Sequence, residues 1–157
     1  MAPQISNTYI TMRTLFSLLA IFALAFTNLA QAQDKVEITI EGNDRMQFNM
    51  DEIKVEAGQT VVLTLKHVGK LPAAAMGHNW VLLTEGTDIQ KFGAAAAKFK
   101  DNGYVPEGSD QVIATTELIG GGQETTIEFT APEAGTYDFI CSFPGHYALM
   151  KGKFIVE

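Results

Sequence analysis

Apolar and polar residues alternate along several short stretches of this chain, as they do in β-strands that turn one face towards a core. The first stretch places Val36, Ile38 and Ile40 on one side, and residues 60–67 alternate in the same way. Further extended pieces are predicted at 46–48, 53–56, 79–83, 111–115, 125–129, 136–141 and 152–156. Turns rich in glycine, proline and asparagine separate these pieces, which is typical of an all-β domain.

The pattern changes between residues 84 and 110, where a helical period replaces the alternation. Apolar residues spaced by three, four and three positions fall on one helical face: Ile89, Phe92, Ala96 and Phe99. Thr87 and Gln90 form a capping-box pattern at the start, and Asn102-Gly103 supplies a stop. One helix inserted among seven to eight strands predicts an all-β fold, a Greek-key sandwich or flattened barrel.

The first 32 residues have the composition of a secretory signal peptide. They contain no acidic residue, one basic residue (Arg13), an apolar run from Leu15 to Phe26, and Ala30-Gln31-Ala32 as a cleavage pattern. The alternative is a membrane anchor, but this run has twelve residues and a bilayer span needs about 20. We therefore expect export to the periplasm, with translation starting at Met1 or Met12 and one domain spanning residues 33–157.

The expected mature chain is acidic and carries one thiol. Without Arg13, ten basic residues face eighteen acidic ones, a formal charge of −8. Such a charge argues against nucleic acid or an anionic membrane surface as a partner. Cys141 is the single cysteine, so it cannot form an internal disulfide, and an odd cysteine in an exported protein indicates an intermolecular bridge, a reactive thiol or a metal ligand.

Three potential metal ligands lie on one predicted loop between two strands. Cys141, His146 and Met150 follow the spacing Cys-x4-His-x3-Met. A thioether is a poor ligand for zinc and a common weak axial ligand of blue copper, so Met150 favours copper. Taken one at a time, each residue also has an ordinary structural role: Cys141 as a thiol in the core, His146 as a solvated loop residue and Met150 as an apolar side chain that fills the end of the barrel. Their joint occurrence on one short loop favours the metal site.

Such a site needs a second imidazole from elsewhere in the chain, and His67 and His78 are the candidates. His78 follows Gly77, and a glycine lets the backbone approach a metal closely and present its carbonyl. His67 ends a predicted strand without such a neighbour. The sequence chemistry therefore favours His78 over His67.

Several segments together resemble the azurins, bacterial blue-copper proteins of the cupredoxin class. They are Met76-Gly77-His78-Asn79-Trp80, Leu118-Ile119-Gly120, Gly42-Asn43-Asp44-x-Met46-Gln47-Phe48, and Cys141-x-Phe-Pro-Gly-His-x-Ala-Leu-Met-Lys-Gly. The resemblance covers essentially all of residues 33–157. Plastocyanin-like proteins have a shorter interval between cysteine and histidine, and the dinuclear copper domain of oxidases needs two cysteines.

The resemblance implies one type-1 copper per chain. Its trigonal plane would be formed by His78, Cys141 and His146, with Met150 and the Gly77 carbonyl as long axial contacts. Around the ligands, Asn79 would connect the two ligand loops and, with the Phe143 amide, donate towards the Cys141 sulfur. His67 would correspond to a family histidine that is not a ligand, and a pH-dependent coupling of His67 to the copper stays an open alternative.

The implied function is electron transfer by a protein that is mostly monomeric and does not enter the membrane. An apolar patch around the His146 edge would meet redox partners such as c-type cytochromes and terminal reductases or oxidases: Met46, Leu71, Met76, Phe143, Pro144, Gly145 and Ala148. The alternatives are copper delivery, for which the chain has no Met-rich or His-rich tract, and an enzymatic copper domain, for which it has no second histidine cluster.

The chain departs from the azurin pattern at two places. Val36 and Gly58 stand where azurins carry a disulfide, so a crosslink typically worth about 2–4 kcal/mol is absent. Thr115 stands where the family has a surface histidine. The first departure bears on stability, and we draw no functional conclusion from the second.

Overall fold

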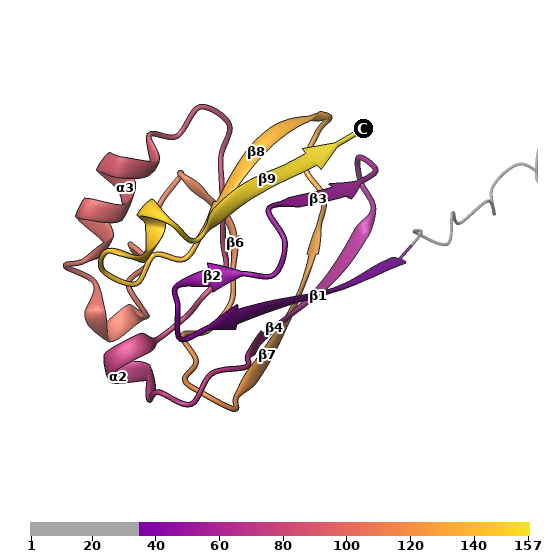
Figure 1. Ribbon diagram of the computed structural model, residues 1–157. Helices are drawn as coiled ribbons and strands as arrows, with labels where there is room; N and C mark the ends of the chain where they lie inside the picture. Colours follow the sequence, from indigo (N-terminus) through magenta and orange to yellow (C-terminus); the bar gives the residue numbers. More distant parts are fainter. Residues whose placement is uncertain (1–34) are drawn as a thin grey trace, which may run out of the picture. The chain divides into compact units, whose positions relative to one another are not determined.

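Two β-sheets face each other in the computed structural model, which describes residues 35–157 (Figure 1). The first sheet has the order β2-β1-β4-β7, with β1 (Lys35–Asn43), β2 (Gln47–Phe48), β4 (Thr60–His67) and β7 (Glu124–Thr130). The second has the order β3-β9-β8-β5-β6, with β3 (Glu52–Val55), β5 (Val81–Leu83), β6 (Val112–Thr115), β8 (Gly135–Ile140) and β9 (Lys151–Val156). The prediction of an all-β sandwich is confirmed. The predicted signal peptide and its cleavage point lie outside the described residues.

The strands pair mostly in antiparallel fashion, with two parallel exceptions. β1 runs parallel to β4, and β3 runs parallel to β9. The register of β1 on β4 aligns Ile38 with Leu63 and Ile40 with Leu65, so the apolar faces of both strands turn to the same side. Parallel neighbours are far apart in sequence, and the alternation within each strand does not reveal which strand becomes its neighbour.

The core between the sheets contains a group of aromatic rings. Trp80 lies 5.7 Å from Phe139 and 6.1 Å from Phe154 between ring centroids, and all three side chains are fully buried. A second apolar cluster joins β5 and β8 to the helix α3 (Ile89–Ala96) through Val81, Leu83, Phe92, Ala96, Val105 and Ile140. Strands β5 and β8 are thus covered on both faces, as their nearly continuous apolar runs require.

The inserted helix differs from its prediction at both ends. Its N-cap is Asp88, whose carboxylate accepts hydrogen bonds from the backbone of Gln90 and Lys91, so the predicted Thr87–Gln90 capping box is wrong. The Thr87 hydroxyl instead forms a hydrogen bond with the Thr84 hydroxyl. An aspartate one residue later competes successfully because its carboxylate satisfies two backbone donors. Phe99 lies beyond the end of α3 and is partly exposed rather than part of its buried face.

Short helical pieces also appear at 73–76 and 146–148, where the sequence predicts loops, and at 100–102, where it predicts the end of the main helix. A four-residue helix, α2 (Ala73–Met76), precedes Gly77, and 3₁₀ turns occupy Lys100–Asn102 and His146–Ala148. Gly103, with φ of 61°, caps the 3₁₀ turn rather than the main helix, which ends earlier. Within residues 35–157, no helix is long and apolar enough to cross a membrane.

Candidate metal centre

Three donor atoms from distant parts of the chain converge at one end of the sandwich. The Sγ atom of Cys141 lies 3.8 Å from Nδ1 of His78 and 3.6 Å from Nδ1 of His146, and the two Nδ1 atoms are 3.2 Å apart. A point in the plane of this triangle lies about 2 Å from all three atoms, which matches metal–nitrogen and metal–sulfur bonds of about 2.0–2.3 Å. The cluster therefore fits a single metal ion held by two imidazoles and a thiolate.

The loop between β8 and β9 brings Cys141 and His146 together through its own backbone. The amide of Cys141 donates to the carbonyl of Met150 at 2.9 Å, and the amide of Met150 donates to that of His146 at 2.8 Å. Gly145 has φ of 84°, a left-handed conformation that favours glycine, and it allows the chain to turn immediately before His146. The sequence spacing Cys-x4-His-x3-Met thus corresponds to one closed loop.

His78 reaches the cluster from the segment between α2 and β5, and its ring orientation is determined by a backbone contact. Its backbone exchanges two hydrogen bonds with Ile119, each 2.9 Å long. Its Nε2 atom donates to the carbonyl of Asn43 at 2.9 Å, so the unprotonated Nδ1 faces Cys141. A hydrogen bond of this kind, on the ring nitrogen away from a metal, orients a histidine ligand.

Met150 and Gly77 both lie close to the three donor residues. The carbonyl of Gly77 is 3.8 Å from the Cys141 sulfur. The Met150 side chain is fully buried, and a methyl group added at Gly42 would meet both the His78 ring, at 2.8 Å, and the Met150 terminal methyl, at 3.4 Å. Gly42 therefore leaves space in which the His78 ring and the end of Met150 come near each other.

Asn79 connects the two segments that carry the donor atoms. Its carbonyl oxygen accepts from the amide of Ser142 at 2.8 Å, and its amide group donates to the Ser142 hydroxyl at 2.8 Å and to the Gly103 carbonyl at 2.9 Å. The backbone amides of Asn79 and Phe143 donate to the Cys141 sulfur. Ser142 and Asn43 are absent from the sequence prediction, because a backbone carbonyl leaves no sequence signal and a single serine has many ordinary roles.

His67 lies beside the cluster but does not contribute a donor atom to it. Its Nδ1 accepts from the amide of Gly69 at 3.1 Å, and its Nε2 donates to the carbonyl of Met76 at 2.8 Å. Both ring nitrogens therefore have backbone partners in the neutral form. The ring packs against His78 with centroids 4.3 Å apart. His67 thus supports His78 from behind and joins the cluster to the segment before α2.

Burial dominates the electrostatics of the donor groups. It raises the pKa of the Cys141 thiol to about 12, against the opposing effect of the Asn79 and Phe143 amides. Burial also lowers the pKa of His146 to about 4, with smaller contributions from His78 and His67, and it lowers the pKa of His78. The imidazoles are thus neutral near pH 7 and available as ligands, while a bound cation must replace the thiol proton.

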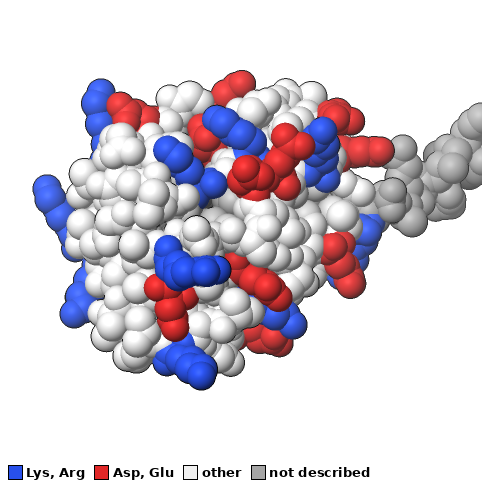
Figure 2. Space-filling view, viewed as in Figure 1, with Lys and Arg blue, Asp and Glu red and all other residues white. Residues whose placement is uncertain are grey.

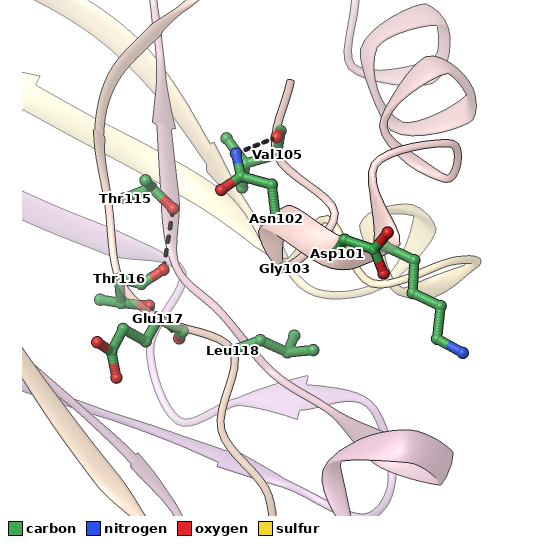
Figure 3. A pocket seen from close by; sticks show the side chains of 9 residues that line it. Asp101, Asn102, Gly103, Val105, Thr115, Thr116, Glu117 and Leu118 are labelled. Atoms are coloured by element: carbon green, nitrogen blue, oxygen red, sulfur yellow. Dashed lines mark hydrogen bonds between the residues drawn. The ribbon is translucent and has the colours of Figure 1, made fainter. Parts of the chain in front are cut away.

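A cavity of about 570 Å³ has a lining that includes none of the three donor residues (Figure 3). Its walls come from residues 100–103, 105 and 115–118, and the Asn102 side chain donates to the Val105 carbonyl at 2.7 Å. The cavity meets the cluster indirectly, because the Gly103 carbonyl in its wall accepts from Asn79. Its lining mixes charged, polar and apolar residues, and none of their side chains has a buried nitrogen or oxygen atom without a hydrogen-bond partner.

The predicted apolar patch is accessible in the structure. Leu71, Pro144, Gly145 and Ala148 are exposed, and Met46, Met76 and Phe143 are half-buried. Leu149, which the sequence analysis does not include, is 64 % exposed and lies between Ala148 and the buried Met150. His146 itself is only 4 % exposed, and the Phe143 ring packs 4.6 Å from its ring.

Comparison with known proteins gives consistent results. A family model described as copper binding proteins, plastocyanin/azurin family, matches residues 34–157. An azurin from Alcaligenes faecalis is 43 % identical over 121 residues, covering 74 % of this chain and 94 % of the relative. An azurin from Pseudomonas denitrificans is 45 % identical over 127 residues, covering 76 % and 97 %.

Solved structures show the same similarity. Auracyanin A, a "blue" copper protein from the green thermophilic photosynthetic bacterium Chloroflexus aurantiacus, superposes with a TM-score of 0.72 at 34 % identity. The match covers 78 % of this chain and 99 % of auracyanin A. An azurin from Methylomonas sp. strain J gives a TM-score of 0.70 at 32 % identity, over 80 % and 99 % of the two chains.

Proposed function

The chain belongs to the plastocyanin/azurin family of copper-binding proteins, and we propose that it is a single-electron carrier cycling one copper between Cu(II) and Cu(I). The predicted cupredoxin fold is confirmed, as is one type-1 copper as the cofactor. The observation that carries the proposal is the buried triangle of two imidazole nitrogens and one thiol sulfur.

We assign the metal ligands to His78, Cys141 and His146, with Met150 and the Gly77 carbonyl as axial contacts. Three donors of mixed softness with a weak thioether are typical of blue copper. The Asn43 carbonyl holds the His78 ring, and the Cys141 and Met150 backbones are bonded to each other. Because these supports lie within the protein, the donor atoms have little freedom to rearrange between oxidation states.

The residues around the sulfur would adjust the redox potential. Copper supplies the one-electron change when bound, and Cys141 binds it as a thiolate after losing its proton. The Asn79 and Phe143 amides donate towards that sulfur and stabilise its negative charge. Asn79 also fixes Ser142, so it holds both sides of the cluster at once.

Transfer would proceed through the His146 edge and the apolar patch of Met46, Leu71, Met76, Phe143, Pro144, Gly145 and Ala148. Apolar surfaces with few charges suit brief docking and fast release. The predicted signal peptide favours the periplasm, where c-type cytochromes and terminal reductases or oxidases would be suitable partners. The full burial of Cys141 and His78 favours a resident copper over rapid delivery. One such cluster lies within residues 35–157, which supports a carrier rather than an enzyme.

The test is a Cu(II) titration followed by visible absorption. We expect an intense blue band that saturates at one copper per chain, and Cys141→Ser should abolish it. His78→Gln and His67→Gln form a matched pair, because the two rings stack but His78 alone supplies a donor atom. The first variant should lose the normal band and the second should keep it. Equal loss in both, or a band that survives Cys141→Ser, would refute the assignment.

A further inference from the structure

Two basic residues are direct chain neighbours of members of the apolar patch at the copper end. Arg45 precedes Met46, and Lys70 precedes Leu71, and both basic residues are exposed. Five basic residues in 35–157 each lie within 4.0 Å of a carboxylate: Lys35, Lys54, Lys66, Lys91 and Lys153. Arg45 and Lys70 have no such partner among the described residues, and neither do Lys98, Lys100 and Lys151. The charges of Arg45 and Lys70 are therefore available to a molecule that docks on the patch.

The single acidic residue in these patch-bearing segments is Asp44, and its carboxylate is bound to backbone. It accepts from the amide of Lys70 at 2.8 Å and from that of Leu71 at 3.3 Å. These hydrogen bonds lower the pKa of Asp44, and they join the 43–46 turn to the segment that begins at Val68. Asp44 thereby places Arg45 and Lys70 on neighbouring segments while using its own oxygens internally.

Both segments are attached to the copper ligand His78. The 43–46 turn contacts it directly, through the hydrogen bond between the Asn43 carbonyl and the His78 ring. The Lys70 segment contacts it through His67, which accepts from Gly69 and stacks on His78. The backbone segments that carry the two basic residues are thus connected to the ligand set by short chains of contacts.

The local charge contrasts with that of the whole protein. The chain carries a formal charge of −7, yet residues 68–84 contain one charged residue, Lys70, and residues 141–150 contain none. In the space-filling view the side that holds α2, α3 and the β8–β9 loop is mostly white with basic groups along its margin, while acidic and basic groups intermix elsewhere on that face (Figure 2). An acidic molecule thus carries a small basic edge beside its docking patch.

We propose that Arg45 and Lys70 select a redox protein whose docking surface has carboxylates around an apolar centre. The inference rests on the proposed electron-carrier function and names the partner chemistry of the same site. The overall negative charge disfavours close approach of such a partner, so the local pair orients it with the patch towards its redox group. A partner with a basic docking surface would instead be repelled by the positive charges of Arg45 and Lys70.

The test uses two protein probes that differ in surface charge. One is a lysine-rich c-type cytochrome, and the other is the same cytochrome after succinylation of its lysines. Electron transfer from the Cu(I) protein to the ferric haem gives Cu(II) and ferrous haem, which stopped-flow absorption follows. The variants are R45E/K70E and, as a matched control, K35E/K54E, which changes the net charge equally. Lys35 is the first residue of β1, and Gly42 lies near the other end of that strand. Lys54 lies on the edge strand β3.

At an ionic strength of about 0.01 M, where screening extends to about 30 Å, R45E/K70E should slow the reaction with the succinylated cytochrome about tenfold. It should accelerate the reaction with the lysine-rich cytochrome, and K35E/K54E should change both rates much less. Equal effects of the two double variants, or no effect of either, would overturn the proposal. Blue absorption at one copper per chain confirms that each variant is folded. Failure of the wild type to reduce either cytochrome would instead contradict the electron-carrier function.

Discussion

His67 lies almost flat against His78, with ring centroids 4.3 Å apart and ring planes inclined by 19°. The outer ring is held by the Gly69 amide and the Met76 carbonyl, while the inner ring directs Nδ1 to Cys141 and His146. Two of the three histidines of the chain therefore form a stacked pair, in which His67 supports the ring of His78 and His78 supplies a donor atom to the cluster. This arrangement separates the structural contribution of His67 from the ligand chemistry of His78.

His67→Phe should destabilise the protein without removing the copper site. The variant retains a ring against His78 but leaves the half-buried Gly69 amide and Met76 carbonyl without their His67 partner, which costs at most about 1–3 kcal/mol for each group. Urea unfolding of the copper-free protein measures the loss, and His67→Gln should recover part of it because it restores hydrogen-bonding atoms. An unchanged unfolding midpoint in His67→Phe would contradict the structural role.

Gly93→Ala should disturb the ligand loop from the side of α3. A methyl group at Gly93 would overlap the Tyr147 ring, which directly follows His146 in the chain. Overpacking of this kind costs about 1–3 kcal/mol. The overlap involves ring atoms close to the Tyr147 backbone, so a side-chain rotation cannot remove it and the loop itself must move. We expect lower stability and a shifted copper absorption band. Tyr147→Ala in the same chain should restore much of the loss, and a double variant no more stable than Gly93→Ala would contradict the contact.

Met150→Leu should keep the blue band and raise the reduction potential. The backbone bonds of Met150 to Cys141 and His146 persist, while loss of the thioether removes a weak donor that favours Cu(II). Cyclic voltammetry measures the potential. Met50→Leu is the control, because Met50 packs against the apolar core rather than the cluster. Equal potentials in wild type and Met150→Leu would mean that Met150 only fills space.

The copper-free protein should lose stability as the pH falls from about 6.5 to about 4. Burial lowers the pKa of His146 to about 4, so the unfolded chain, with a histidine pKa near the ordinary value of 6.5, binds more protons in this window. Stability is therefore complete above pH 6.5 and declines towards pH 4. Urea midpoints at pH 7.5, 6.0 and 5.0 test this expectation, and His146→Gln should show a weaker dependence. A midpoint that stays constant in the wild type would contradict it.

Local patterns in the sequence were sufficient to predict the strands and the loop of the cluster. Strand alternation reflects the pleat itself, in which successive side chains point to opposite faces, so it can be read within a few residues. Cys141, His146 and Met150 lie within ten residues, and hydrogen bonds inside the same loop bring the first two together. These features depend on neighbours along the chain, and sequence spacing records them directly.

The tertiary structure decided everything that depends on contacts between distant segments. His78 and Cys141 are 63 residues apart, as are Asn79 and Ser142, so no local spacing reveals that they meet. Sequence chemistry favoured His78, but the Asn43 carbonyl determines which of its nitrogens faces the cluster. The parallel pairing of β1 with β4 also requires the folded chain. The same holds for Asp44, whose carboxylate accepts hydrogen bonds from the Lys70 and Leu71 amides. The physical reason is that packing and hydrogen bonding act between atoms close in space, while a sequence orders residues by chain position alone.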